Sequence, residues 1–133
     1  MSLELVMILP ILMLVLVAVV EFTLLLSASQ GISSAADRGA REAALPSSTK
    51  ASIDAAVARG LEGYLWRNKQ ETWIFVNKVK DTTGALVAAA NTGDVIQVTV
   101  NVQARYTAPD VLSIVKISLG TQDLSSSYVV QRQ

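Results

Sequence analysis

The chain has no cysteine and no histidine, and only 5% of its residues are aromatic. These absences exclude disulfides, thiol nucleophiles, the usual zinc sites and the commonest general base. The few aromatic residues argue against base-stacking surfaces, and eleven acids balance eleven bases, so no basic footprint for nucleic acid exists. We therefore expect no nucleic-acid partner, no metal and a fold held together by packing alone.

Catalytic motifs are also missing. The sequence has no glycine-rich phosphate loop and no carboxylate cluster with calcium-loop spacing. Glu4 and Glu21 would lie about 25 Å apart along a helix, too far to act as a catalytic pair. We expect the protein not to be an enzyme and to have no cofactor and no small-molecule substrate.

One long apolar segment dominates what is present. Residues 5–20 carry no charge and, after Glu21, the uncharged stretch continues through Ala36. A membrane span needs about 20 residues, so residues 5–26 are long enough if Glu21 is tolerated. Strong helix formers predict one helix over residues 1–44, which ends before Pro46. Such a helix, roughly 65 Å long, is about twice the thickness of the hydrocarbon layer, so its second half must lie in water or against protein.

Glu21 is the unusual residue of this segment, because a charge near the centre of a lipid-exposed helix costs several kcal/mol. Three explanations are open: the side chain reaches the nearby membrane surface, it contacts a partner helix, or the span lies further toward the N-terminus. Glu4 precedes the apolar run directly. It is either an ordinary helix N-terminal charge or a partner for the amino terminus of a neighbouring subunit.

A row of small residues follows the apolar run, with a spacing of four. Gly31, Ala35, Gly39 and Ala43 would share one edge of the helix and allow another helix to approach closely. The approaching helix is either the chain's own second helix or the helix of a neighbouring subunit.

The remaining sequence predicts a small α+β head. A second helix is predicted from an N-cap at Ser47 or Ser48 to about Asn68, with an apolar stripe that includes Ile53, Val57, Leu61 and Leu65. Residues 72–80 read as a strand, and strict alternation over residues 95–106 predicts a half-buried antiparallel strand.

The end of the chain is less regular. A turn is predicted at residues 91–94, and residues 125–133 are predicted to form the last, edge strand. Residues 110–120 fit a short helix or a strand. The predicted fold class is α+β, with residues 1–45 as a transmembrane and extended helix and residues 46–133 as a head in which one helix packs on an antiparallel sheet.

Several of these features together resemble one known family. A glutamate (Glu4) precedes the apolar run, Leu9-Pro10 and Val20-Glu21-Phe22 lie within it, and Ala36, Gly39, Ala40 and Arg41 follow. This pattern is similar to the N-terminal half of TadE-like proteins, the minor pilins or pseudopilins of tight-adherence (Flp-type) pilus systems.

The resemblance implies a pilin-like structural protein of the bacterial cell envelope. It implies a single-pass helix in the inner membrane, an extracytoplasmic head, possible incorporation into a surface pilus, and a role for Glu4 in subunit registration. The implied partners are other pilin-like subunits, the pilus assembly machinery and a prepilin peptidase. The alternative is a single-pass envelope protein whose head binds a protein partner.

The flanking charges differ from the family pattern. No lysine, arginine or glycine precedes Glu4, whereas Arg38 and Arg41 follow the span. Basic residues favour the cytoplasmic side, so this distribution taken alone favours a cytoplasmic head. We expect that a short basic leader is removed from the mature protein. Cleavage after Ser27-Ala28-Ser29 to give a secreted protein is disfavoured, because the preceding run is too long and contains Glu21.

Overall fold

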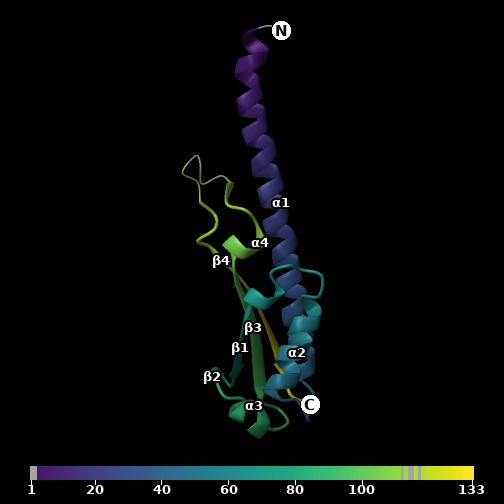
Figure 1. The fold of residues 1–133 in the computed structure, drawn as a ribbon. Coiled ribbons are helices and arrows are strands. Elements are labelled where there is room, and N and C mark those ends of the chain that lie inside the picture. Colours follow the sequence, from purple (N-terminus) through teal and green to yellow (C-terminus); the bar gives the residue numbers. More distant parts are fainter. Residues whose placement is uncertain (1–2, 112, 114–115, 117) are drawn as a thin grey trace.

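A computed structural model describes residues 3–111, 113, 116 and 118–133, and only the backbone is described for residues 3–5. The chain begins with one long helix, α1 (Leu3–Ala43), followed by a small head (Figure 1). The elements of the head are α2 (Lys50–Gly60), η1 (Arg67–Lys69), β1 (Glu71–Val76), β2 (Val79–Asp81), α3 (Ala85–Ala89), β3 (Val95–Gln103), α4 (Ala104–Thr107) and β4 (Asp123–Gln131). This arrangement confirms the predicted α+β fold class.

The four strands form one antiparallel sheet in the order β2-β1-β3-β4. The pairing places Ile74 of β1 opposite Val98 of β3, and Val98 opposite Tyr128 of β4. Strand β4 lies at one edge of the sheet, as predicted. The alternation in β3 is also confirmed, because Ile96 and Val98 are buried, as are Val100 and Val102, while the residues between them are not.

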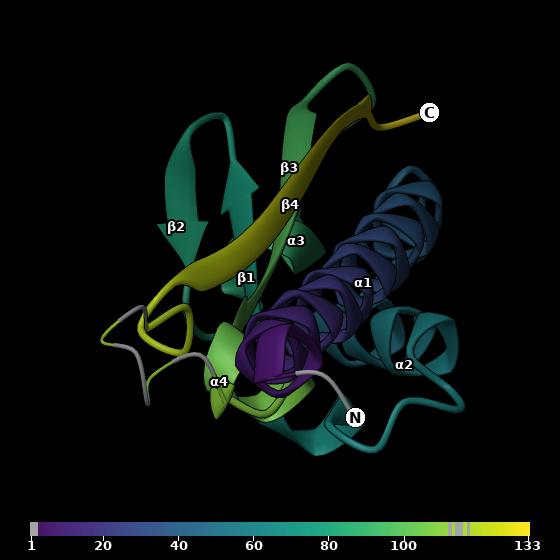
Figure 2. The same ribbon diagram turned by 90° about the horizontal axis from the view of Figure 1, so that it is seen from above.

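The core lies between one face of this sheet and the two longer helices. Viewed along α1, helices α1 and α2 lie together on the same side of the sheet (Figure 2). Helix α1 contributes Ala28, Ile32 and Ala35 to the core, and α2 contributes Ile53 and Val57. The predicted division at residue 45 falls in the turn between the helices, but the core extends across it. The second half of α1 is therefore part of the head.

The second helix differs from its prediction at both ends. Its N-cap is Thr49, which exchanges hydrogen bonds with Ser52 in a capping box. Ser48 instead donates its hydroxyl hydrogen bond to the Ala43 carbonyl at the end of α1. The helix ends at Gly60 rather than near Asn68, and the φ of Gly63, 99°, lies outside any right-handed helix.

Two further predictions in this region were wrong. Leu65, assigned to the apolar stripe, is fully exposed. Residues 72–80 form a hairpin rather than one strand, because Asn77 and Lys78 both have positive φ and make the two-residue turn between β1 and β2. The Asn77 side chain stabilises this turn, since it donates to Asp94 and accepts from the Val95 N–H.

The alternation beyond β3 also ends earlier than predicted. Strand β3 stops at Gln103, and α4 follows, so Tyr106 is 39% exposed rather than on a buried strand face. Helix α3 was not predicted, although a turn does follow it at residues 91–94. The segment of residues 110–120, for which helix and strand were both open, falls partly outside the described residues.

Arg132 ties the end of the chain to the base of the head. The side chain is only 5% exposed, and its guanidinium donates to the carbonyls of Val87 and Pro46. Its backbone N–H donates to the Asp94 carbonyl at 2.9 Å, and the next N–H, of Gln133, donates to Ala44 at 3.0 Å. These contacts join β4 to α3, to the turn before β3 and to the turn between α1 and α2.

Replacement of this arginine tests the tie. We expect Arg132→Met to lower the free energy of unfolding by about 2–3 kcal/mol, because the buried carbonyl of Val87 and the part-buried carbonyl of Pro46 lose a charged donor. The measurement is urea unfolding of the full chain in detergent, followed by circular dichroism. Arg67→Met, at an exposed arginine, serves as the control and should change stability by less than about 0.5 kcal/mol. If the two variants are equally stable, Arg132 does not tie the end of the chain to the base of the head.

Candidate membrane anchor and helix interface

The first half of α1 is an apolar rod with little contact to the rest of the protein. Almost none of its residues are buried, and α1 is long and apolar enough to cross a membrane. In the described part of the chain, no other helix is both long enough and apolar enough to cross a membrane. The exposed large apolar side chains of this half are Val6, Met7, Ile8, Leu9, Ile11, Leu12, Met13, Leu14, Val15, Leu16, Val19, Val20, Phe22, Leu24 and Leu26. Apolar side chains on every side of a helix are typical of a membrane span or a helix enclosed by other helices.

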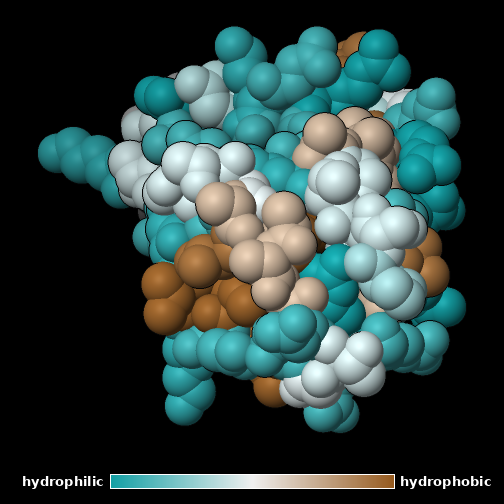
Figure 3. Space-filling view, turned by 90° about the horizontal axis from the view of Figure 1, so that it is seen from below, coloured by the Kyte–Doolittle hydropathy of each residue, from teal (hydrophilic) through white to brown (hydrophobic). Residues whose placement is uncertain are grey.

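The opposite end of the molecule has a different surface. Seen from below, the end of the head farthest from the N-terminus of α1 is mostly hydrophilic, with small apolar areas (Figure 3). The apolar surface is thus concentrated at one end of the long axis. This polarity indicates a protein that is anchored by one end and exposes the other to water.

Glu21 lies in the contact between α1 and the head. Its side chain is 2% exposed, and it interacts with another group of the chain. On the same side of α1, Val17 and Ala18 are half-buried, and further along Ala28 is buried. The carboxylate is therefore enclosed by protein rather than extended along the helix surface. Glu4 belongs to α1, but its side chain is outside the described residues.

The small-residue edge of α1 is filled by the chain's own head. A Cβ atom added to Gly31 would lie 2.6 Å from the ring of Tyr64, and one added to Gly39 would lie 2.7 Å from Val57 of α2. Conversely, a Cβ on Gly60 of α2 would lie 2.6 Å from the Cα of Ala35. Ala43, the last of the four, is fully buried. The two helices therefore pack at nearly backbone contact.

Two polar contacts hold the same interface in register. The Tyr64 hydroxyl donates a hydrogen bond to the Ser27 carbonyl at 3.4 Å. The Ser33 hydroxyl donates to the hydroxyl of Ser126 on β4 at 3.1 Å. The Tyr64 ring is in turn packed against Trp66, with ring centroids 4.8 Å apart. Together these contacts fix α1 on the chain that follows α2 and on the edge strand β4.

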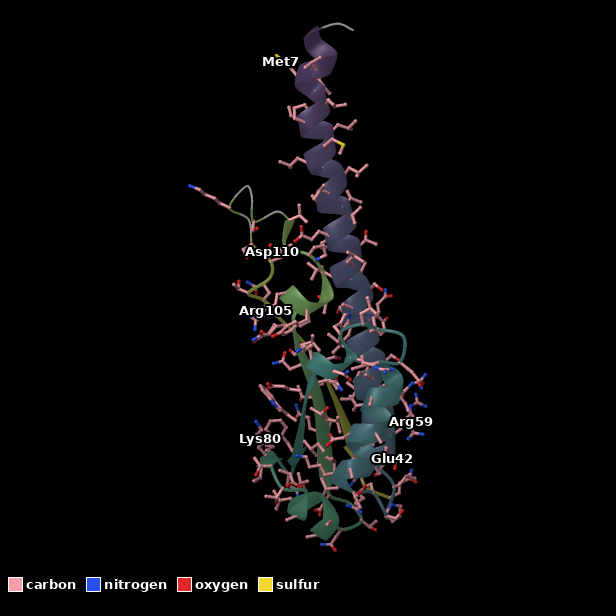
Figure 4. The ribbon with its side chains drawn as sticks, in the orientation of Figure 1. Met7, Glu42, Arg59, Lys80, Arg105 and Asp110 are labelled. Carbon is pink, nitrogen blue, oxygen red and sulfur yellow. The ribbon has the colours of Figure 1, made fainter. Side chains whose placement is uncertain are left out.

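The outward face of α1 in the head is polar and basic. Arg38, Arg41 and Arg59 line an open groove of about 340 Å³ between α1 and α2, with Glu42 beside them. Figure 4 shows Glu42 and Arg59 together on this side, away from the sheet. Arg41 also pairs with Asp37 at 3.0 Å, one turn earlier on α1. A solvated helix face accounts for this pattern.

A shallow cavity of about 430 Å³ lies on the open face of the sheet. Its lining includes Trp73 and Tyr106, and Lys69 lies 5.5 Å from the Tyr106 ring centroid. Acids and bases are mixed there, with Glu71 and Asp123 among the lining residues. Among the described residues, no three acidic, cysteine or histidine side chains are placed to hold a metal.

The shifted pKa values in the head belong to structural acids. Burial raises the pKa of Asp81, but N–H donors from Val87, Gly84 and Thr83, with the charge of Lys50, outweigh it and hold the pKa below its usual range. This carboxylate caps the start of α3. A lowered pKa stabilises the fold above the unfolded value of about 3.9, and this stabilisation is lost as the pH falls through the folded pKa.

Sequence reasoning did not find the contact between the head and the middle of α1. Leu119 and Leu124 face α1 across a small apolar pocket, and Val17 and Ala18 are half-buried nearby. Leu119 lies in an irregular segment and Leu124 lies near the start of β4, so neither carries a periodic signal that would assign it to this contact. The sequence did reveal the separate contact of α1 with Tyr64 and α2, since the small-residue edge stood out by its spacing.

The fold and the anchor together define a class of protein: a small α+β head built around the second half of an N-terminal helix whose first half can cross a membrane. The family model described as TadE-like protein matches residues 1–41, which confirms the resemblance over the length of α1. These two findings fit a membrane-anchored protein associated with pili. Comparison with curated proteins and comparison with solved structures each gave no significant match.

The close packing at Gly39 gives a direct test of what fills the small-residue edge. We expect Gly39→Leu to destabilise the head by about 1–3 kcal/mol or more, because even a Cβ would collide with Val57 and lie 3.1 Å from Val98. The measurement is urea unfolding together with limited proteolysis in detergent.

Ser34→Leu is the matched control, because Ser34 is exposed on the same helix. It should shift stability by less than about 0.5 kcal/mol. If Gly39→Leu is as stable as this control, α2 does not occupy the edge and the helix of another subunit remains a candidate for it.

Proposed function

We propose that this protein is a pilin-like, TadE-like subunit that takes part in the assembly of a tight-adherence type pilus. The observation that carries the proposal is the exposed apolar half of α1, which coincides with the segment that matches the TadE-like family. The role is structural, with no catalytic step assigned to any residue. Its partners are other pilin-like subunits and the pilus assembly machinery.

The mechanism is an exchange of lipid contact for helix contact. Side chains such as Leu12, Met13 and Val15 are apolar and exposed, so they are equally compatible with acyl chains and with neighbouring helices. Transfer from the bilayer into a helical bundle therefore costs little. The first half of α1 would be held in the membrane before assembly and in the bundle after it.

The second half of α1 couples this exchange to the head. Since Gly31 and Gly39 lie at close contact with Tyr64 and Val57, the helix cannot slide past α2 without steric overlap. The head would then move with the helix as one body. This coupling lets a force on the apolar half displace the whole subunit.

The proposed location is the inner membrane, with an extracytoplasmic head. A prepilin peptidase is the proposed processing partner, and Glu4 is the proposed registration residue near the processed end. The mostly hydrophilic far end of the head is compatible with exposure to water after assembly (Figure 3).

Cysteine cross-linking in the native host tests this function, because the natural chain contains no cysteine. Met7→Cys and Leu14→Cys lie two turns apart on one face of α1. We expect disulfide-linked species that contain the chain in sheared surface filaments from these variants. Thr92→Cys, in an exposed turn of the head, is the control and should give few such species.

The rival function gives a different result. A membrane-anchored envelope protein whose head binds a partner would remain entirely in the membrane fraction and be absent from sheared filaments. That distribution would overturn the assembly role even if cross-links form within the membrane.

A further inference from the structure

The length of the apolar run conflicts with a head that lies wholly outside the membrane. Glu4 marks the polar start of the run, so a span of about 20 residues that begins at Leu5 ends near Leu24. Protein already encloses α1 at Glu21, which is 2% exposed, and the pocket against the head begins at Phe22. Residues 5–20 alone provide about 24 Å of the roughly 30 Å hydrocarbon layer. About 6 Å of the layer's depth therefore coincides with the contact between α1 and the head.

The parts of the head at this depth are the start of α4, residues 119–122 and the start of β4. Leu119 and Leu124, with Ala104 and Gln122, face Phe22, Leu25 and Leu26 of α1 across a pocket of about 270 Å³. Figure 4 shows Asp110, which accepts a hydrogen bond from Leu119, between the levels of Met7 and Glu42. The lining is apolar apart from Gln122. The pocket is continuous with the exposed surface of α1, because Phe22 is 65% exposed and Leu26 is 52% exposed.

The described residues beside the pocket pair several of their polar groups with one another. The Asp110 carboxylate accepts from the Ser118 hydroxyl at 2.6 Å and from the Leu119 N–H at 3.3 Å. The Gln122 N–H donates to the Leu119 carbonyl at 3.1 Å. Gly120 permits this close arrangement, since a Cβ there would lie 2.9 Å from the Asp110 carboxylate. Backbone groups at membrane depth need such partners.

Exposed tyrosine and basic side chains also occur in α4 and in the chain that follows it. Arg105 donates to the Tyr106 hydroxyl at 2.9 Å, and both residues are exposed. Lys116 is also exposed. Tyrosine and basic side chains are typical of the headgroup level, where cations meet lipid phosphate.

From these observations we propose that the head is seated in the bilayer at this end, and that the pocket formed by Phe22, Leu25, Leu26, Leu119 and Leu124 holds an acyl chain of a phospholipid in the leaflet nearest the head. The contact encloses Glu21 at the same depth, with 2% of its surface exposed, so protein rather than lipid surrounds the carboxylate. The inference rests on the proposed membrane anchoring of α1.

Spin labels on single cysteines test the proposal in the full chain. Leu119→Cys labels the pocket wall, Leu12→Cys labels the middle of the exposed run, and Thr92→Cys labels the far end of the head. The chain is reconstituted in nanodiscs of phosphatidylethanolamine and phosphatidylglycerol. Collision rates are then measured by electron paramagnetic resonance with lipid-soluble oxygen and a water-soluble nickel chelate.

We expect the label at position 119 to resemble that at position 12, with an oxygen-to-nickel accessibility ratio several-fold higher than at position 92. Gln122→Cys, exposed on the pocket rim, should give the same result without the loss of an apolar side chain. If both pocket labels resemble position 92 while position 12 is shielded from nickel, the seating of the head is overturned and the anchor stands. If the label at position 12 is itself accessible to the nickel chelate, the proposed membrane span is overturned.

A second copy of the chain is the rival occupant of the pocket. Dipolar broadening between labels at position 119, absent when labelled chain is diluted with unlabelled chain, would show such an occupant and overturn the lipid assignment. Unbroadened spectra with the expected accessibility ratio support the acyl chain.

Discussion

The close packing of α1 against α2 is the contact on which the rest of the structure depends. Two glycines of α1 and one of α2 remove the side-chain atoms that would hold the helices apart, and the approach is near enough for a Cβ to contact a backbone atom. This packing places Ile32 and Ala35 of α1 in the core with the sheet. A head of under 100 residues has little capacity to bury a core alone, so the helix supplies a substantial share of it.

Because one continuous helix is both core and anchor, the two halves of α1 meet different surroundings without a break between them. The first half has apolar side chains on all sides, whereas the second half alternates buried small residues with exposed polar ones such as Ser34 and Arg38. No flexible linker separates the anchor from the head. The position of the head relative to the membrane is thus set by where along α1 the head is attached, and that attachment begins inside the apolar run.

The sequence predicted the elements whose signals are periodic or compositional. The extent of α1 followed from its apolar run and from Pro46, and β3 followed from strict alternation. The early end of α2 and the hairpin at Asn77 depend on positive φ angles, which periodicity does not record. The role of Arg132 and the contact of Leu119 with α1 arise between residues far apart in the chain, so no local pattern could reveal them.

A cysteine accessibility scan along α1 in native membranes, with a membrane-impermeant maleimide, tests the dual use of this helix most directly. The account predicts that every position from 6 to 16 is protected, and that between 27 and 41 the exposed positions Ser27, Ser34 and Arg41 react while Ala28 and Ala35 do not. A denatured sample shows that each cysteine is present and reactive. Reaction at positions 6–16, or equal reaction at Ser34 and Ala35, would contradict the claim that one helix is at once the membrane anchor and the core of the head.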